Sequence, residues 1–144
     1  MGKRAAYFLD TNVLLYAVGR PHAYKQACIE ILQRIETDEI QVVTSVEVLQ
    51  EILHRYRSIG KPDLASKVFR YCKVLCDEIF PVLEDDLDQA EDLLRIHEEI
   101  AVRDAVHAAV MKRCGIERIL STDRHFDPLP LVERVDPKDF KKQE

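Results

Sequence analysis

The stretch FLDTNVLLY, residues 8–16, joins the end of an apolar run to a carboxylate and then to a second apolar run. The first run extends unbroken over residues 5–9, which is typical of a strand buried on both faces of a parallel sheet. Asp10 follows this expected strand directly. In open parallel sheets, ligands bind at the carboxyl ends of the strands, so Asp10 is a candidate site residue. Taken alone, Asp10 could equally be the N-cap of a helix that begins at Asn12, since Asp is a favoured cap.

Apolar patterns of helical and strand period alternate along the rest of the chain. Pro21 can open a helix that continues to about Glu36, and Thr44 with Glu47 matches a capping box for a helix that should stop near Gly60. Further helices are expected at 64–76, 87–96 and 102–115, and further strands at 40–43, 79–82, 116–120 and 131–135. This alternation predicts an α/β fold, in which a mainly parallel central sheet is flanked by helices on both faces.

With 144 residues, 47% of them hydrophobic, the chain fits one domain that can bury a sizeable core. We expect a single domain over residues 1–144, with 139–144 as a frayed tail. No apolar run reaches the length of a signal-peptide core or a membrane span, so we expect a cytoplasmic protein without membrane contact.

The four cysteines form no zinc-site pattern and are expected to be buried, reduced thiols. The net charge of −5 argues against nucleic-acid binding by bulk positive potential but permits a local basic patch or a bound cation.

A second carboxylate follows a strand later in the chain. Asp123 comes shortly after the expected strand 116–120, and a role as a turn residue is the alternative. Asp10 and Asp123 each stand beside a threonine, Thr11 or Thr122, whose hydroxyl can orient a carboxylate or a metal-bound water. Because ligand sites form at the carboxyl ends of parallel strands, the two acids together indicate one shared pocket.

Two further acids lie on expected helices. Asp104 occupies the first turns of a helix that is apolar nearly all round, so it should lie at a buried edge and need a partner. A favourable interaction with the helix dipole is the alternative explanation for Asp104. Glu51 lies one turn after Glu47 and points away from the apolar stripe of its helix, so periodicity alone favours exposure to solvent.

Three segments occur in order along the chain: DTNVLLY (10–16), TSVEVLQEIL (44–53) and RDAVHAAVMKRCGIERILSTDRHFD (103–127). Together they resemble PIN-domain ribonucleases and are similar to the VapC toxins of prokaryotic toxin–antitoxin pairs, from residue 10 to about residue 135. The resemblance implies a catalytic acidic set made of Asp10, Glu51, Asp104 and Asp123. It also implies four supporting residues, namely Thr11, Asn12, Thr122 and, as a supplementary acid, Asp127.

Carboxylates about 4 Å apart repel by about 4 kcal/mol per pair at an effective dielectric near 20, so such a set needs a cation. Oxygen ligands without a Cys/His set select a hard ion, Mg²⁺ or Mn²⁺. On this hypothesis Asp10 and Asp104 are the main metal ligands, and Asp123 binds the ion through water. Glu51 is a ligand or the base that orients the attacking water. The sequence leaves open whether one or two ions bind.

Other polar residues near the acids have ordinary explanations. His107 and His125 are expected to be structural or surface histidines and lie outside the predicted catalytic set. Arg103, Arg124 and Lys112 are plausible phosphate contacts, with solvated basic side chains as the alternative.

The resemblance implies an endoribonuclease that acts on single-stranded or looped RNA, with a cognate antitoxin protein as its partner and a homodimer as its assembly. A metal-dependent phosphatase of the haloacid-dehalogenase type also has an Asp after its first strand, but it needs a second Asp where this chain has Asn12. The remaining alternative is a PIN-fold RNA-binding or RNA-processing module without a toxin role. The four acids argue against a module that binds RNA without cleaving it.

Overall fold

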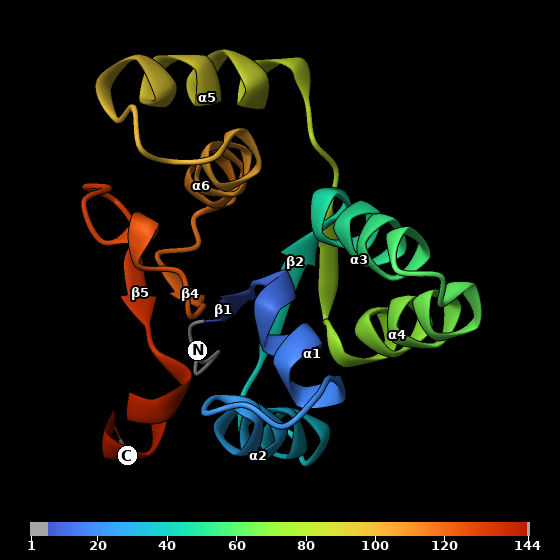
Figure 1. The fold of residues 1–144 in the computed structure, drawn as a ribbon. Coiled ribbons are helices and arrows are strands. Elements are labelled where there is room, and N and C mark those ends of the chain that lie inside the picture. The colour runs from blue at the N-terminus through green and yellow to red at the C-terminus, as the bar shows by residue number, and fades with distance from the viewer. Residues whose placement is uncertain (1–5, 144) are drawn as a thin grey trace.

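The computed structural model describes residues 6–143 and has a parallel sheet at its centre (Figure 1). Its strands are β1 (Tyr7–Leu9), β2 (Val42–Ser45), β3 (Glu78–Phe80), β4 (Arg118–Leu120) and β5 (Glu133–Val135). Within the described residues the five strands have the order β3-β2-β1-β4-β5, so the strand that precedes Asp10 is the central one. β1 pairs in parallel with β2 on one side and with β4 on the other, where Leu9 lies opposite Leu120. The predicted parallel α/β fold is confirmed.

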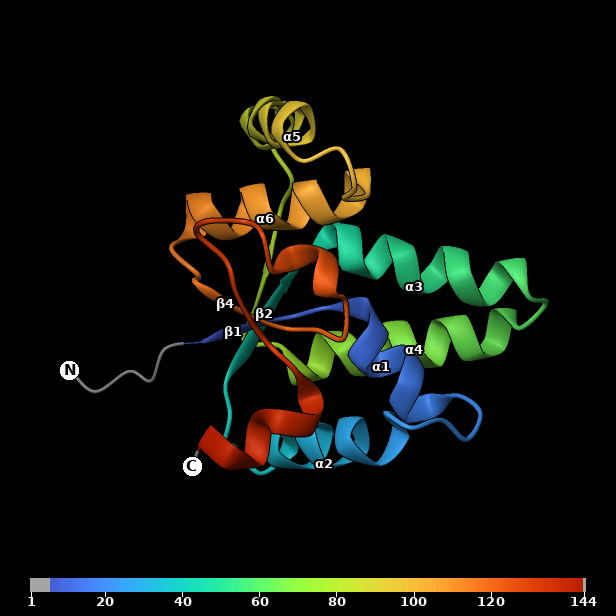
Figure 2. The same cartoon turned by 60° about the vertical axis from the view of Figure 1, so that its left-hand side comes forward.

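Helices cover both faces of this sheet (Figures 1 and 2). They are α1 (Thr11–Val18), α2 (Lys25–Glu36), α3 (Val46–Ser58), α4 (Pro62–Leu75), α5 (Glu84–Ile96) and α6 (Val102–Cys114), with short 3₁₀ turns η1 (Arg124–Phe126) and η2 (Pro137–Gln143). α1 packs on α2 below the sheet in Figure 2, and α6 lies above it with α5 packed on its outer side. α3 and α4 form a hairpin-like pair, with α3 also in contact with α1 and α6. The N-terminal ends of α1, α3 and α6 therefore approach one another.

The core begins in the stretch that follows the first strand. Phe8, Leu9, Val13 and Leu14 are all fully buried. α6 is buried from Asp104 to Met111, as its apolar pattern predicts, and it ends at Gly115 in the left-handed conformation with φ 73°. The four cysteines are free thiols, and three of them are buried as expected, whereas Cys114 is only partly buried. Within residues 6–143 no helix is both long and apolar enough to cross a membrane.

Several predicted boundaries were wrong. α2 begins at Lys25, so Pro21 lies in the preceding loop rather than in the first turn of the helix. The N-cap of α3 is Ser45, whose hydroxyl accepts from the Glu47 N–H at 3.2 Å. Thr44 belongs to β2 instead, where its hydroxyl donates to the Leu9 carbonyl at 3.0 Å, and a β-branched residue suits that strand. The N-cap was thus predicted one residue too early, and with Ser45 as the cap the third residue of α3 is Val48, so Glu47 is not the acid of a capping box.

The two ends of the chain only partly fall within the described residues. Residue 5, at the start of the expected first strand, and residue 144, at the end of the expected tail, lie outside them. Phe140, inside the segment 139–144 expected to be frayed, is 5% exposed and its ring centroid lies 5.4 Å from that of Tyr7. This residue therefore belongs to the core.

Candidate active site

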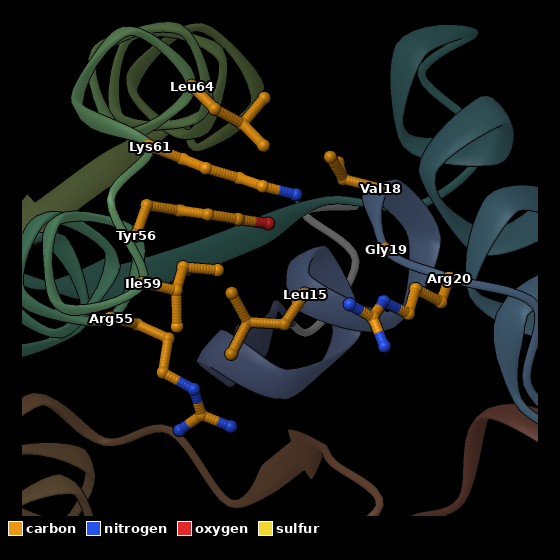
Figure 3. A pocket seen from close by; sticks show the side chains of 9 residues that line it. All are labelled: Leu15, Val18, Gly19, Arg20, Arg55, Tyr56, Ile59, Lys61 and Leu64. Carbon is orange, nitrogen blue, oxygen red and sulfur yellow. The ribbon is translucent and has the colours of Figure 1, made fainter.

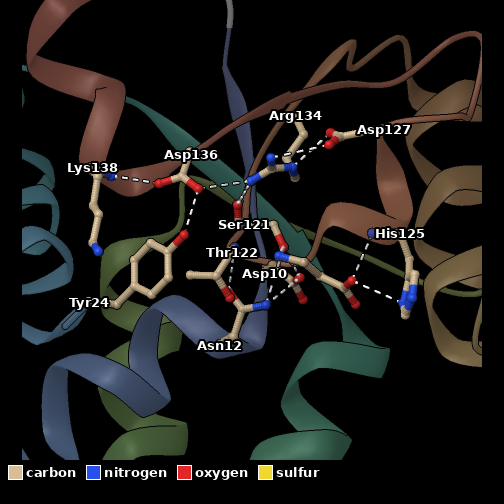
Figure 4. Close-up of polar contacts among 11 residues, drawn as sticks. Asp10, Asn12, Tyr24, Ser121, Thr122, His125, Asp127, Arg134, Asp136 and Lys138 are labelled. Carbon is tan, nitrogen blue, oxygen red and sulfur yellow. Dashed lines mark hydrogen bonds and ion pairs between the residues drawn. The ribbon is translucent and has the colours of Figure 1, made fainter. Parts of the chain in front are cut away.

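Asp10 is fixed at the junction of β1 and α1 (Figure 4). The residue is 4% exposed, and one carboxylate oxygen accepts from the Thr11 N–H at 2.8 Å. The other oxygen accepts from the Ser121 hydroxyl at 2.6 Å and from the Asn12 amide at 3.1 Å. Asp10 is thus the N-cap of α1 and also a buried acid at the end of the central strand.

Ser121 is the hydroxyl residue that contacts this acid, and the sequence did not single it out. Its oxygen also accepts from the Asn12 amide at 3.2 Å and from the Asp123 N–H at 3.0 Å. Thr122, which was expected to supply the hydroxyl, instead uses its backbone N–H to donate to the Asn12 side chain at 3.2 Å. The pairing of β1 with β4 is what would have indicated Ser121. Leu9 pairs with Leu120, so the next residues, Asp10 and Ser121, are neighbours.

Glu51 reaches the same pocket from α3. Its side chain is 14% exposed, the Thr11 hydroxyl donates to Oε1 at 2.8 Å, and the Arg103 Nε lies 3.2 Å from Oε2. The structure therefore shows that Glu51 faces the pocket, which helical periodicity could not predict. The two contacts come from α1 and α6, so they depend on how three helices meet and not on the pattern within α3.

Asp104 and Asp123 complete the acidic cluster. Asp104 is 3% exposed in the first turn of α6, and Asp123 caps η1 by accepting from the His125 N–H at 2.9 Å. Burial, and then contact with the Asp123 carboxyl and the charge of Asp10, hold the pKa of Asp104 far above its ordinary range. The four predicted acids are thus brought together at the carboxyl ends of β1 and β4.

Burial also dominates the electrostatics of Asp10. It raises the pKa of Asp10 from its ordinary 3.8 to about 6, although the hydrogen bonds from Ser121 and Thr11 oppose this rise. The nearby Asp123 carboxylate raises the pKa further and the Arg103 guanidinium lowers it. A cluster of buried carboxylates with one half-exposed cation has more negative charge than its own side chains neutralise.

His107 lies against this cluster from the next turn of α6. It is fully buried, with its Nε2 3.9 Å from Asp10 Oδ1 and 4.0 Å from Glu51 Oε1. Burial lowers the pKa of His107 to about 4, so the ring is neutral at neutral pH. Neither ring nitrogen has a hydrogen-bond partner among the described residues. The predicted site did not include this residue.

The donor atoms in the pocket fit a divalent cation. Asp10, Glu51 and His107 each offer one ligand atom, and these three atoms lie within 4.8 Å of one another. Two carboxylates and one imidazole are ligand types that Mn²⁺ accepts, and Asp104 and Asp123 add negative charge beside them. A bound cation would also offset the burial of these charges.

Asp127 and Lys112 lie apart from the cluster. The Asp127 carboxylate is bound by Arg134 through two contacts, of 2.8 and 3.2 Å, and Arg134 in turn donates to the Ser121 carbonyl at 3.1 Å (Figure 4). Asp127 is thus connected to the site through Arg134. Lys112 is two turns beyond Asp104 on α6, roughly 12 Å along the axis, so the structure does not bring it to the acids.

A groove of about 590 Å³ separates the end of α1 from the α3–α4 pair (Figure 3). Its lining combines apolar and basic side chains, among them Leu15, Ile59, Leu64, Arg20, Arg55 and Lys61. Leu15 and Arg55 each lie one helical turn beyond a site residue, Thr11 and Glu51 respectively, and residues four apart share a helix face. The groove therefore starts next to the acidic cluster.

The chain is similar to known proteins over most of its length. A family model described as PIN domain matches residues 7–130. The ribonuclease VapC13 of Mycobacterium tuberculosis is 35% identical over 127 residues, which cover 88% of this chain and 97% of that protein. The crystal structure of Mycobacterium tuberculosis VapC20, described as a sarcin-ricin loop cleaving toxin, has a TM-score of 0.71 at 22% identity and covers 89% of this chain and 98% of that one. A toxin–antitoxin complex from Klebsiella pneumoniae has a TM-score of 0.64 at 15% identity and covers 92% and 98%.

Proposed function

We propose, on the premise that this chain belongs to the PIN-domain family, that it is a metal-dependent endoribonuclease and the toxin of a toxin–antitoxin pair. The observation that carries the proposal is the meeting of Asp10, Glu51, Asp104 and Asp123 in one pocket, in which Asp10 and Asp104 are buried. Such a cluster is costly for a purely structural purpose, because burial raises the pKa of two of these acids. It supports a hydrolase more than a module that only binds RNA.

Asp10 and Asp104 would be the main ligands of a divalent cation, Mg²⁺ or Mn²⁺, and Asp123 would help to hold it through water. When bound, it supplies a Lewis acid for the phosphoryl group and lowers the pKa of a nearby water. The protein contributes orientation: Ser121 and the Thr11 N–H hold both oxygens of Asp10.

Glu51 is the proposed base, and its surroundings suit that role. The Thr11 hydroxyl and the Arg103 guanidinium fix its carboxylate, so one oxygen can accept the proton of the attacking water. The side chain of Arg103 is 50% exposed, so it can also contact a phosphate that enters from solvent. Water then attacks phosphorus as its proton passes to Glu51, and the bond to the leaving ribose oxygen breaks as that oxygen takes up a proton from solvent.

The proposed substrate is RNA, which places the protein in the cytoplasm. The proposed partner is a cognate antitoxin protein. The groove between α1 and the α3–α4 pair supports this partner, because its apolar side chains and its three basic residues suit an acidic, amphipathic segment. Since the groove starts next to Glu51, a segment that fills it can also cover the acids.

We also propose a homodimer. Four large apolar side chains near the N-terminal ends of α3, α5 and α6 are exposed to between 43% and 63%: Val46, Leu83, Leu87 and Val102. Leu87 and Val102 line one hollow together with Val106 and Glu51. Exposed apolar side chains grouped in this way are typical of an interaction surface.

The proposal is tested by incubating labelled, structured RNA with the purified protein and Mg²⁺ or Mn²⁺, beside an EDTA control. Asp10→Asn should abolish cleavage, whereas the matched variant Asp63→Asn, which changes an exposed acid on α4, should cut like the parent protein. Cleavage that persists in Asp10→Asn would contradict the assignment. Binding of several RNAs without cleavage of any, by the parent protein with either metal, would favour the RNA-binding module.

A further inference from the structure

His107 is the buried polar side chain in the pocket whose position the proposed function leaves unexplained. Its ring is fully buried, and both ring nitrogens lack a hydrogen-bond partner among the described residues. Buried polar atoms are nearly always satisfied, because leaving one unpaired costs about 1–3 kcal/mol. A histidine kept only to fill the core could be replaced by an apolar residue at no such cost.

The position of the His107 ring indicates an interaction with the acids of the pocket, and not a role in core packing alone. His107 is three residues after Asp104 on α6, so both side chains lie on the same face of the helix. Phe8 of β1 packs against the ring at 5.3 Å between centroids and so restricts how it can turn. The Nε2 edge is directed at the Asp10 and Glu51 carboxylates.

The distances from His107 Nε2 to the two carboxylates fit ligands of one shared ion and do not fit direct hydrogen bonds. The spacings of 3.9 Å to Asp10 and 4.0 Å to Glu51 are too long for hydrogen bonds. They match two ligand atoms of one cation, since atoms that each lie about 2.1 Å from an ion are separated by about 3 to 4 Å. The three atoms fall within 4.8 Å of one another, so a single ion can reach all of them.

We propose that His107 supplies a nitrogen ligand to the catalytic cation, together with Asp10 and Glu51, and thereby selects Mn²⁺ over Mg²⁺. The proposal rests on the proposed metal-dependent function, and it departs from the expectation that His107 is structural. Imidazole is a better ligand for the later divalent metals than for Mg²⁺, which prefers oxygen and water. Under this assignment Glu51 shares its carboxylate between the ion and the attacking water.

The first test uses the unmodified protein loaded with Mn²⁺ and pulsed electron paramagnetic resonance. A directly bound histidine nitrogen gives a ¹⁴N modulation of the spin echo, and growth with ¹⁵N-histidine should replace it by the ¹⁵N pattern. Among the described residues, two other histidines lie near the acids: His125, whose Nδ1 lies 3.2 Å from the Asp123 carboxylate, and His54, which lines a hollow together with Glu51. The signal should persist in His125→Gln and disappear in His107→Phe.

Metal binding measured by calorimetry gives the second readout. The parent protein should bind Mn²⁺ at least about 10-fold more tightly than Mg²⁺, and His107→Phe should weaken Mn²⁺ binding at least about 10-fold with little effect on Mg²⁺. Its circular dichroism and urea unfolding in EDTA check that the variant folds.

The outcomes separate the two proposals. Tight Mn²⁺ binding without any histidine nitrogen signal, or a signal lost in His125→Gln, would overturn the role of His107 and leave the nuclease standing. Absence of Mn²⁺ and Mg²⁺ binding by the parent protein would overturn both. Three results together would establish His107 as the ligand. The ¹⁵N pattern should replace the ¹⁴N signal in the ¹⁵N-histidine sample, the signal should disappear in His107→Phe, and the preference of that variant for Mn²⁺ over Mg²⁺ should be reduced.

Discussion

Replacing Asp10 with asparagine should make the metal-free protein more stable at neutral pH while it abolishes cleavage. Burial raises the pKa of Asp10 from 3.8 to about 6, so the folded chain binds this proton more tightly than the unfolded chain does. The contribution of Asp10 to stability is therefore fully present below about pH 4 and is lost as the pH rises through 6. Asparagine carries no charge, so it avoids that loss.

The expected size follows from the pKa change. A rise from 3.8 to about 6 corresponds to roughly 3 kcal/mol of unfolding free energy at pH 7.5. The amide group of the variant would face the Asn12 amide where the carboxylate accepts a hydrogen bond, which costs about 1 kcal/mol. The net gain in EDTA should therefore be about 2 kcal/mol at pH 7.5, and near pH 4, where mainly the hydrogen-bond cost remains, the variant should be slightly less stable than the parent protein.

Urea unfolding of both proteins in EDTA, at pH 7.5 and pH 4, measures this difference. Adding Mn²⁺ should reverse the order at pH 7.5, because an ion that binds only the folded parent protein stabilises it by mass action. The reasoning is refuted if Asp10→Asn is less stable than the parent protein in EDTA at pH 7.5. It is also refuted if Mn²⁺ stabilises the two proteins equally.

Three other substitutions test separate parts of the structure. Ser121→Ala removes the shortest hydrogen bond to Asp10 and should weaken Mn²⁺ binding about 10-fold in calorimetry, whereas unchanged affinity would deny that bond a role. Arg134→Gln leaves the half-buried Asp136 carboxylate without its ion pair and should lower the unfolding free energy in urea by about 3 kcal/mol; a loss below about 1 kcal/mol would contradict this. Leu87→Asp should convert the proposed dimer to a monomer in light scattering after size-exclusion chromatography, and an unchanged mass would place the interface elsewhere.

The position of side chains that follow the strands was predictable from the sequence, because a parallel sheet brings the carboxyl ends of its strands to one edge. Residues 5–9 read as a buried strand from their composition alone, and the position of Asp10 after them indicated the site. Asp104 was also expected at a buried edge, since α6 is apolar nearly all round. In both cases the local sequence pattern is enough to predict where the side chain lies in the fold.

Glu51 and His107 could not be located in this way. Periodicity describes the faces of one helix, and it assigns Glu51 to solvent because it ignores Thr11, 40 residues away, and Arg103 on another helix. His107 was expected to be a structural or surface histidine, and which side chains it faces depends on how α6 crosses β1 and α3. The family resemblance, not periodicity, placed Glu51 in the predicted set, and neither indicated His107.

The most direct test of the central claim is to follow oxygen from water into the RNA product. Cleavage in H₂¹⁸O with Mn²⁺, analysed by mass spectrometry, should place one ¹⁸O in the new terminal phosphate at each cut, with no 2′,3′-cyclic phosphate. Asp10→Asn should yield no product. Cyclic phosphate ends without ¹⁸O, or equal cutting by Asp10→Asn, would contradict an acidic pocket that directs water at the phosphodiester bond.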